Sequence, residues 1–344
     1  MNTEVVAKFR KIVGSLQGTI NILITQVDPD ALASAFAMSF LLRFIRGNGV
    51  VKIFYAGSVS HRQNLTMCNR LGLYDRMRPA TDMKDDDFKN LVLVDSSMSI
   101  DGRCLHGKKL NPMIVVDHHF GGDIMDADDR FVLIEKIGAS STLVLELCED
   151  FGVNLGEMDS FIPILIAAGI YTDTLGLTAF MNRDLIAYGK VALVSDQQEL
   201  MHIFNYPLHE SNYKNMRLAL ENVCRHGAHL ITNIGPIDSK DGDDISTAAD
   251  LLIRMDGVSL VIVWAMIKDR KEVRVSARST DSSLDLCSYL KERFGASCGS
   301  KPTPDKKSSG GGTMSLDLGF WLNNHTVPEA VALVNKFIES AIFH

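Results

Sequence analysis

The chain has 344 residues, more than a single hydrophobic core normally organises, so we expect two domains. Its formal net charge of −7 argues against a protein that binds long duplex DNA, because such proteins present a broad basic surface. Six cysteines without CxxC spacing indicate reduced thiols. No run approaches the ~20 apolar residues of a membrane span, so we expect no membrane partner and a cytoplasmic protein.

The N-terminal half predicts a parallel sheet preceded by a helix. Apolar residues recur at helical spacing between Val5 and Leu16. Four later apolar runs are continuous rather than alternating, as in strands covered on both faces, and they occupy residues 21–25, 51–57, 91–95 and 113–117. A helix-forming segment, 31–49, separates the first two runs and ends at Gly47 and Gly49. This βαβ order predicts an α/β fold.

The rest of the chain predicts further helices and a smaller α/β domain. Ser140 to Thr142 offer N-cap oxygens to a helix after Gly138, and an apolar segment then ends at Asp173. The pattern becomes mixed before a break at Pro207. Two strands follow, at 258–267 and 272–279, and a polar loop runs from Gly299 to Thr313. We therefore divide the chain into a domain at 1–190, a linker at 191–217 and a second domain at 218–344.

Acidic side chains follow the predicted strands at the point where each strand ends. They are Asp28 and Asp30 after the first run, Asp95 after the third, Asp117 with His118 and His119 after the fourth, and Asp173 after the later apolar segment. The carboxyl ends of parallel strands meet at one edge of a sheet, so we expect these groups to converge. Converging carboxylates repel one another unless a cation neutralises them, and an oxygen-rich site suits Mn²⁺ or Mg²⁺ better than zinc.

A simpler interpretation exists for each acid taken alone. Asp28 and Asp30 beside Pro29 are typical of a turn and helix cap, and Asp95 before two serines is too. Capping gives no reason for every element to end in acid, so the set as a whole favours a metal site.

In this order the sequences VDPDA, VDSS, VVDHH and GIYTDT resemble the four motifs of the DHH phosphoesterase superfamily. The later VSARS and GGG resemble its substrate-binding DHHA1 domain. Size and domain plan are most similar to the NrnA-like enzymes, the nanoRNases or oligoribonucleases that also act as pAp phosphatases. The resemblance implies hydrolysis of short oligoribonucleotides, dinucleotides or 3′-phosphoadenosine 5′-phosphate (pAp) by a metal-bound hydroxide.

The resemblance also implies two divalent ions, with Mn²⁺ preferred and Mg²⁺ as the alternative, and a role for each site residue. Asp28 would bind the first ion, Asp30, His118 and Asp173 the second, and Asp95 both, while His119 would contact the phosphate and Asp117 would orient the histidines. The second domain would contribute Arg278, Gly310, Gly311, Gly312 and Thr313 to substrate binding.

The chain departs from the family pattern at two positions. The first motif normally opens with a histidine, whose place falls on Ile24 or, with a shorter loop, on Gln26. Glutamine is a poorer ligand than imidazole and isoleucine donates nothing, so the first ion should bind more weakly. His61 is either a distant substitute or an ordinary loop histidine. Thr313 stands where the family has a histidine after the glycines.

Two other functions fit the same residues. The missing histidines allow a catalytically weakened protein that still binds nucleotides. A pyrophosphatase or exopolyphosphatase would surround its anion with cations, for which Arg278 and the region Lys301 to Lys307 are the candidates. Continuous apolar surface on the second domain would suit a homodimer.

Overall fold

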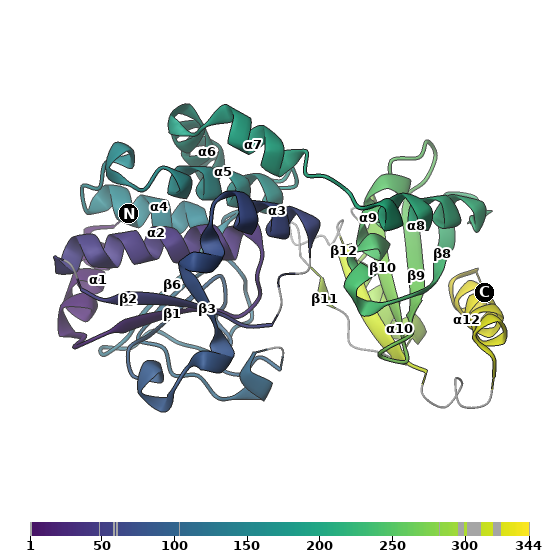
Figure 1. The fold of residues 1–344 in the computed structure, drawn as a ribbon, viewed down its shortest axis with the longest axis horizontal. Coiled ribbons are helices and arrows are strands. Elements are labelled where there is room, and N and C mark those ends of the chain that lie inside the picture. Colours follow the sequence, from purple (N-terminus) through teal and green to yellow (C-terminus); the bar gives the residue numbers. More distant parts are fainter. Residues whose placement is uncertain are drawn as a thin grey trace. The chain divides into compact units, whose positions relative to one another are not determined.

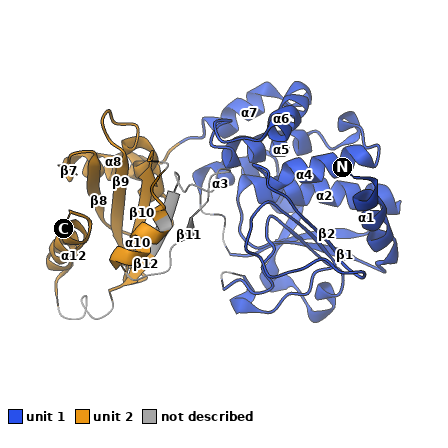
Figure 2. Cartoon of the chain, turned by 180° about the vertical axis from the view of Figure 1, so that it is seen from behind, with its two compact units in different colours: residues 1–207 blue, residues 208–344 orange. Residues whose placement is uncertain are grey.

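The computed structural model describes residues 2–47, 49–57, 59, 61–102, 104–281, 283–294, 299–300, 311–318 and 325–343, with only the backbone described at 287, 299–300 and 311–314. The chain divides into two compact units, residues 1–207 and 208–344 (Figure 2). Each is described by itself.

The division at Pro207 lies within the segment 191–217 that we expected to be a linker. Most of that segment is helical. Helix α7 (Gln197–Phe204) buries Leu200 and Ile203 in the first unit, and α8 (Glu210–Glu221) buries Ala219 in the second. The non-helical connection is confined to residues 205–209, because apolar stripes anchor the flanking helices.

The first unit is an α/β fold with a parallel sheet, as predicted (Figure 1). Its strands are β1 (Ile20–Ile24), β2 (Val51–Tyr55), β3 (Met77–Pro79), β4 (Leu91–Val94), β5 (Ile114–Asp117) and β6 (Phe131–Ile134). Its other helices are α1 (Thr3–Ser15), α2 (Pro29–Arg46), α3 (Arg62–Arg70), α4 (Ser140–Asp150), α5 (Phe161–Asp173) and α6 (Asn182–Val194). The strand order is β3-β2-β1-β4-β5-β6, and every pairing is parallel. The order reverses between β1 and β4, which is where open parallel sheets bind ligands.

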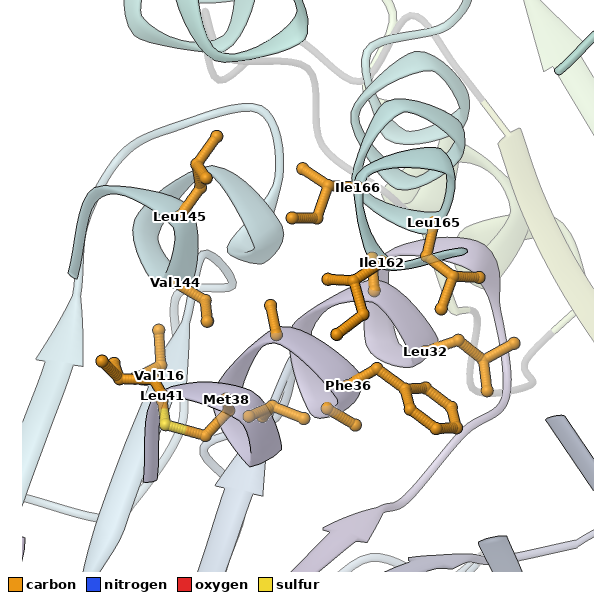
Figure 3. Close-up of a cluster of buried hydrophobic side chains, with 14 of the residues drawn as sticks. Leu32, Phe36, Met38, Leu41, Val116, Val144, Leu145, Ile162, Leu165 and Ile166 are labelled. Atoms are coloured by element: carbon orange, nitrogen blue, oxygen red, sulfur yellow. The ribbon is translucent and has the colours of Figure 1, made fainter. Parts of the chain in front are cut away.

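Both faces of this sheet are covered, which explains the continuous apolar runs. Alternate strand residues such as Ile22 and Val116 join the core formed with the long helices, and Figure 3 draws Val116 of β5 with other side chains of that core. The strand residues that alternate with these, such as Leu23 and Val115, point to the other face and pack against loops and short 3₁₀ turns. A strand buried on both faces has no polar side to alternate with.

Helix α5 is apolar all round because other elements surround it. Ile162, Leu165 and Ile166 lie among the buried side chains between α2, α4 and α5 (Figure 3). Gly169 marks a close approach of α5 to α2: a Cβ atom built at Gly169 would lie 2.9 Å from the Cα atom of Asp30. The absence of a side chain therefore lets α5 pack against the start of α2.

The second unit is a smaller α/β domain with a mixed sheet (Figure 1). Its strands are β7 (Cys224–His226), β8 (His229–Ile237), β9 (Leu260–Ile267), β10 (Glu272–Ser279), β11 (Gly299–Ser300) and β12 (Gly311–Asp317) in the order β11-β12-β10-β9-β8-β7. Besides α8, its helices are α9 (Asp243–Leu252), α10 (Leu286–Phe294) and α12 (Val327–Phe343). Helices α8 and α9 contribute to one core, and α10 and α12 to another.

The prediction of a polar loop from Gly299 to Thr313 is partly wrong. Gly311, Gly312 and Thr313 belong to β12 and pair with β10, where Gly311 lies opposite Arg278 and Thr313 opposite Ser276. Pairing with a neighbouring strand holds the glycines in extended backbone although their strand propensity is low. Gly310 and the lysines at 301, 306 and 307 lie outside the described residues.

Among the described residues, no helix has the length and apolar character that crossing a membrane would require.

The contact at Gly169 generates a prediction about stability. Gly169→Ala forces α5 away from the Cα atom of Asp30 in α2, so we expect urea denaturation to show a loss of about 1–3 kcal/mol in the free energy of unfolding. Gly189→Ala is the matched control, because Gly189 lies inside α6 and a Cβ atom added there would meet no described atom within 4 Å; this variant should gain about 0.5–1 kcal/mol. Equal effects at both sites would contradict the close approach.

Candidate metal centre

Asp28 and Asp30 lie at the start of α2, directly after the loop that follows β1. Asp28 is the N-cap residue: its Oδ1 accepts a hydrogen bond from the backbone N–H of Ala31 at 3.0 Å. Asp30 stands in the first turn and is fully buried. The capping interpretation of Asp28 is therefore correct, but a cap does not explain why Asp30 is buried.

Asp30 caps a different helix. Its Oδ2 accepts from the N–H of Ser140 at 2.7 Å, and its Oδ1 accepts from the N–H of Ser141 at 3.0 Å and from the Ser141 hydroxyl. The N-cap residue of α4 is Ala139, which has no side-chain acceptor, so Asp30 of α2 satisfies these N–H groups instead. Our expectation that Ser140 to Thr142 cap this helix was wrong.

Asp95 is held at the end of β4 in an unusual backbone conformation. Its φ of 56° lies in the left-handed region, which costs most residues roughly 1–2 kcal/mol. Its N–H donates to the carbonyl of Val116 on β5 at 2.9 Å, and its Oδ1 accepts from the Ser140 hydroxyl at 3.0 Å. These bonds fix the Asp95 carboxylate beside the end of β5.

The two histidines after β5 have different partners. Asp117 Oδ1 accepts from the N–H of His119 at 3.0 Å and lies 2.9 Å from its Nδ1. His118 is held instead through Nδ1, 3.2 Å from the carbonyl oxygen of Ile137. Asp117 therefore orients one of the two histidines that we expected it to orient.

The structure brings most of the predicted ligands together. One ligand atom from each of Asp30, Asp95, His118 and Asp173 lies within 4.8 Å of the others. In a second group, ligand atoms of Asp95, His118 and His119 also lie within 4.8 Å of one another. Asp95 and His118 belong to both groups. Asp28 belongs to neither, although its charge acts on both Asp30 and Asp95.

The residues considered as replacements for the first-motif histidine lie in three different surroundings. Ile24 is buried in the core of the first unit, and Gln26 is exposed in the loop after β1. His61 precedes α3, where its ring meets that of Tyr206 edge-on with centroids 5.7 Å apart. In the second unit, Arg278 forms an ion pair with Asp250.

Burial and mutual repulsion dominate the electrostatics. Burial, followed by the charge of Asp173, raises the pKa of Asp30 to about 6. Burial, followed by the charges of Asp28 and Asp30, raises the pKa of Asp95 well above its ordinary value. Burial alone would lower the pKa of His118, but Asp173 and Asp30 raise it to about 9. The cluster therefore favours any bound positive charge.

The residues present fit a divalent cation. The Nε2 atom of His118 is buried, has no hydrogen bond of standard geometry within the described chain, and lies 3.5 Å from Asp95 Oδ1 and 3.4 Å from Asp173 Oδ2. Oδ2 of Asp30 accepts one hydrogen bond from the described residues, which leaves a lone pair for a ligand. Three carboxylates and one imidazole are donors suited to Mn²⁺ or Mg²⁺.

Sequence reasoning missed Asp184, which holds the start of α4, the helix whose first N–H groups donate to Asp30. This buried carboxylate accepts from the N–H of Gly138 at 2.9 Å, the hydroxyl of Thr142 at 2.7 Å and the N–H of Met181 at 2.8 Å. It thereby ties the start of α6 to the start of α4. Because Asp184 follows no strand, its position gave no signal.

Comparisons with known proteins agree with this architecture. No family model matches the chain. The uncharacterized protein MJ1633 of Methanocaldococcus jannaschii is 25% identical over 272 residues, covering 78% of this chain and 53% of the relative. The A-adding tRNA nucleotidyltransferase of Aquifex aeolicus is 36% identical over 104 residues, covering 30% of this chain and 11% of the relative. The chain thus spans about half the length of the first relative and about a tenth of the second.

Among solved structures, an exopolyphosphatase-related protein from Bacteroides fragilis is similar with a TM-score of 0.73 and 13% sequence identity, covering 98% of this chain and 96% of that one. At this identity the similarity shows a shared fold. The α/β fold with a parallel sheet that the sequence predicts is therefore shared with this protein.

The raised pKa values generate a prediction about the metal-free protein. The pKa of Asp30 is about 6 in the folded chain and 3.8 for an unperturbed aspartate. Protonation of Asp30 therefore adds to the free energy of unfolding below about pH 4, and this contribution is lost as pH rises through about 6. The charge on His118 stabilises below about pH 6.5, and this contribution disappears as pH rises through about 9. We expect urea midpoints measured in EDTA to fall between about pH 5 and 9, and added Mn²⁺ to reverse most of the fall.

Asp95→Asn is the informative variant in this experiment. Asparagine tolerates the left-handed φ and keeps an acceptor for Ser140, but it removes one repelling charge. At about pH 8 in EDTA the variant should be about 1–3 kcal/mol more stable than the wild type, and Mn²⁺ should add little. Pronounced stabilisation of the variant by Mn²⁺ would contradict the assignment of Asp95 to the metal centre.

Proposed function

We propose that the protein is a divalent-metal-dependent phosphoesterase that acts on short nucleotides, namely dinucleotides, very short oligoribonucleotides or pAp. One observation carries the proposal: ligand atoms of Asp30, Asp95, His118 and Asp173, from four separate segments, lie within 4.8 Å of one another. The ordered motifs and the fold shared with the exopolyphosphatase-related protein support it.

We further propose two ions rather than one. Asp95 and His118 belong to both compact groups of donors, and a shared carboxylate is the usual bridge between two metals. Mn²⁺ is the preferred ion and Mg²⁺ the alternative, because the donors are mostly oxygen.

Bound divalent ions would lower the pKa of the attacking water and offset charge on the phosphoryl oxygens. The protein's own residues supply the positions. The start of α4 fixes the carboxylates of Asp30 and Asp95 through hydrogen bonds, so neither has to reorganise during the reaction. Asp117 anchors Nδ1 of His119 and leaves the partly exposed far side of that ring available to a phosphate oxygen. No side-chain nucleophile is required.

Turnover assays test the proposal. Purified protein with Mn²⁺ should release mononucleotide from pApA and pGpG or phosphate from pAp, and EDTA should abolish the release. Asp95→Asn should lower kcat by at least about 100-fold, because a charged ligand is lost at the centre of the cluster. Asp86→Asn is the matched control, since Asp86 is exposed and pairs with nearby Lys89, and its activity should be unchanged. A wild type that binds Mn²⁺ but leaves all three nucleotides intact would refute the catalytic proposal.

A catalytically weakened nucleotide-binding protein is the second candidate, and the loop after β1 favours it. Ile24 is buried in the core, Gln26 is neutral, and Asp28 lies outside both groups of metal donors. The first ion would therefore lack a strong anchor.

Gln26→His should restore that anchor if Gln26 occupies the histidine's place. We expect Mn²⁺ calorimetry to show tighter binding of one ion by about 10-fold or more, accompanied by higher turnover at low Mn²⁺. Gln63→His, a change of the same kind at the start of α3, is the control and should leave the affinity as it is. Identical stoichiometry and affinity in the wild type and Gln26→His would show that the loop does not reach the metal.

A pyrophosphatase or exopolyphosphatase is the third candidate function, and the same assays test it with inorganic pyrophosphate and polyphosphate as substrates. Asp250 already neutralises Arg278, one of the cations that such a substrate would need. This pairing favours the nucleotide substrates over inorganic phosphate chains.

A further inference from the structure

Phe120 is an exposed aromatic residue that directly follows His119, a member of the candidate metal centre, in the chain. It is 68% exposed, more than Phe44 at 47% or Phe180 at 37% in the same unit. An isolated exposed apolar residue needs no explanation, but one that adjoins a cluster of ionisable groups is informative.

The exposure of Phe120 does not come from a loosely held loop. Asp123 and Ile124 both donate their N–H groups to the carbonyl of Ser97 at 3.2 Å, and the N–H of Ser99 donates to the Asp123 carboxylate at 2.6 Å. A Cβ atom at Gly122 would lie only 2.0 Å from the Ser97 hydroxyl, so this position requires glycine. The loop after β5 is thus fastened to the loop after β4, and Phe120 projects from a fixed segment.

The loop after β4 carries exposed apolar side chains as well. Met98 is 42% exposed and Ile100 is 51% exposed, and both belong to the segment that fastens the Phe120 loop. The edge of the sheet that carries the acidic cluster therefore also presents apolar surface. A bare phosphate chain has no part that would use it, whereas a nucleotide joins a phosphate to a flat aromatic base.

We propose that Phe120 is a stacking platform for one nucleobase of the substrate and selects nucleotides over inorganic phosphate chains. The proposal rests on the phosphoesterase function proposed above. The Cα atoms of His119 and Phe120 are about 3.8 Å apart, so the nucleoside of a phosphate bound at His119 would lie within reach of the Phe120 side chain. Base stacking on an aromatic ring tolerates any base, which suits an enzyme for short nucleotides of mixed sequence.

A cycle that combines a protein change with a substrate change tests this platform. Wild type and Phe120→Ala are assayed on pApA and on two analogues in which either the 5′ or the 3′ base is replaced by hydrogen. We expect Phe120→Ala to lower kcat/KM on pApA by about 5- to 150-fold, the range of a lost base stack. On the analogue that lacks the stacked base, the same substitution should have little effect.

Two further variants separate stacking from other roles. Phe120→Trp keeps a stacking face and should retain activity on pApA. Met125→Ala removes another exposed apolar side chain of the same loop and should change nothing. Equal losses for Phe120→Ala on pApA and on both abasic analogues would overturn the platform, because the ring would then support the fold or the phosphate instead.

The proposal can fail independently of the phosphoesterase function. If the wild type cleaves pApA and Phe120→Ala does so equally well, the platform is refuted while the phosphoesterase stands. If the wild type cleaves nothing, calorimetry with pApA decides: weaker binding to Phe120→Ala, with abasic binding unchanged, supports the platform, and equal binding refutes it.

Discussion

The repulsion among the side chains of Asp30, Asp95 and Asp173 is the constraint on which the rest of the first unit depends. These carboxylates are almost completely removed from water. The charge of Asp173 raises the pKa of Asp30, and the charges of Asp30 and Asp173 raise the pKa of Asp95. Hydrogen bonds from the start of α4 offset part of the cost, and the ring of His118 offsets another part. Hydrogen bonds do not cancel three negative charges, so the arrangement is stable at neutral pH only with added protons or a bound cation.

The topology of the sheet makes this crowding possible. Strands β1 and β4 are neighbours, and the chain leaves them toward opposite sides of the sheet, which opens a space at their carboxyl ends. The acids that follow β1 and β4 enter that space, and β5 delivers its histidines from the adjacent position. The first turn of α4 lies against the same place because α4 packs on both α2 and β5. Its N–H groups then meet the carboxylate of Asp30, and the dipole of the helix favours that negative charge.

The sequence predicted the features that depend on local pattern and missed those that depend on tertiary partners. Runs such as LVLVD identified the two-sided strands because burial on both faces removes alternation. Acids at strand ends identified the site because parallel strands share an edge. Asp184 was missed because it contacts the start of α4 from a helix remote in sequence. The strand at Gly311 to Thr313 was missed because only pairing with β10 makes glycines extended.

Asp30 shows why capping and metal binding are not alternatives for the same carboxylate. A carboxylate has about four lone-pair positions, and the described N–H and O–H donors occupy three of them on Asp30. These donors fix the orientation of the group and draw electron density from it, which helps a metal compete with a proton for the remaining position. A residue that only capped a helix would have no reason to lie beside Asp95 and Asp173. Burial among other acids, rather than the presence of a cap, is therefore the feature that separates a ligand from an ordinary helix start.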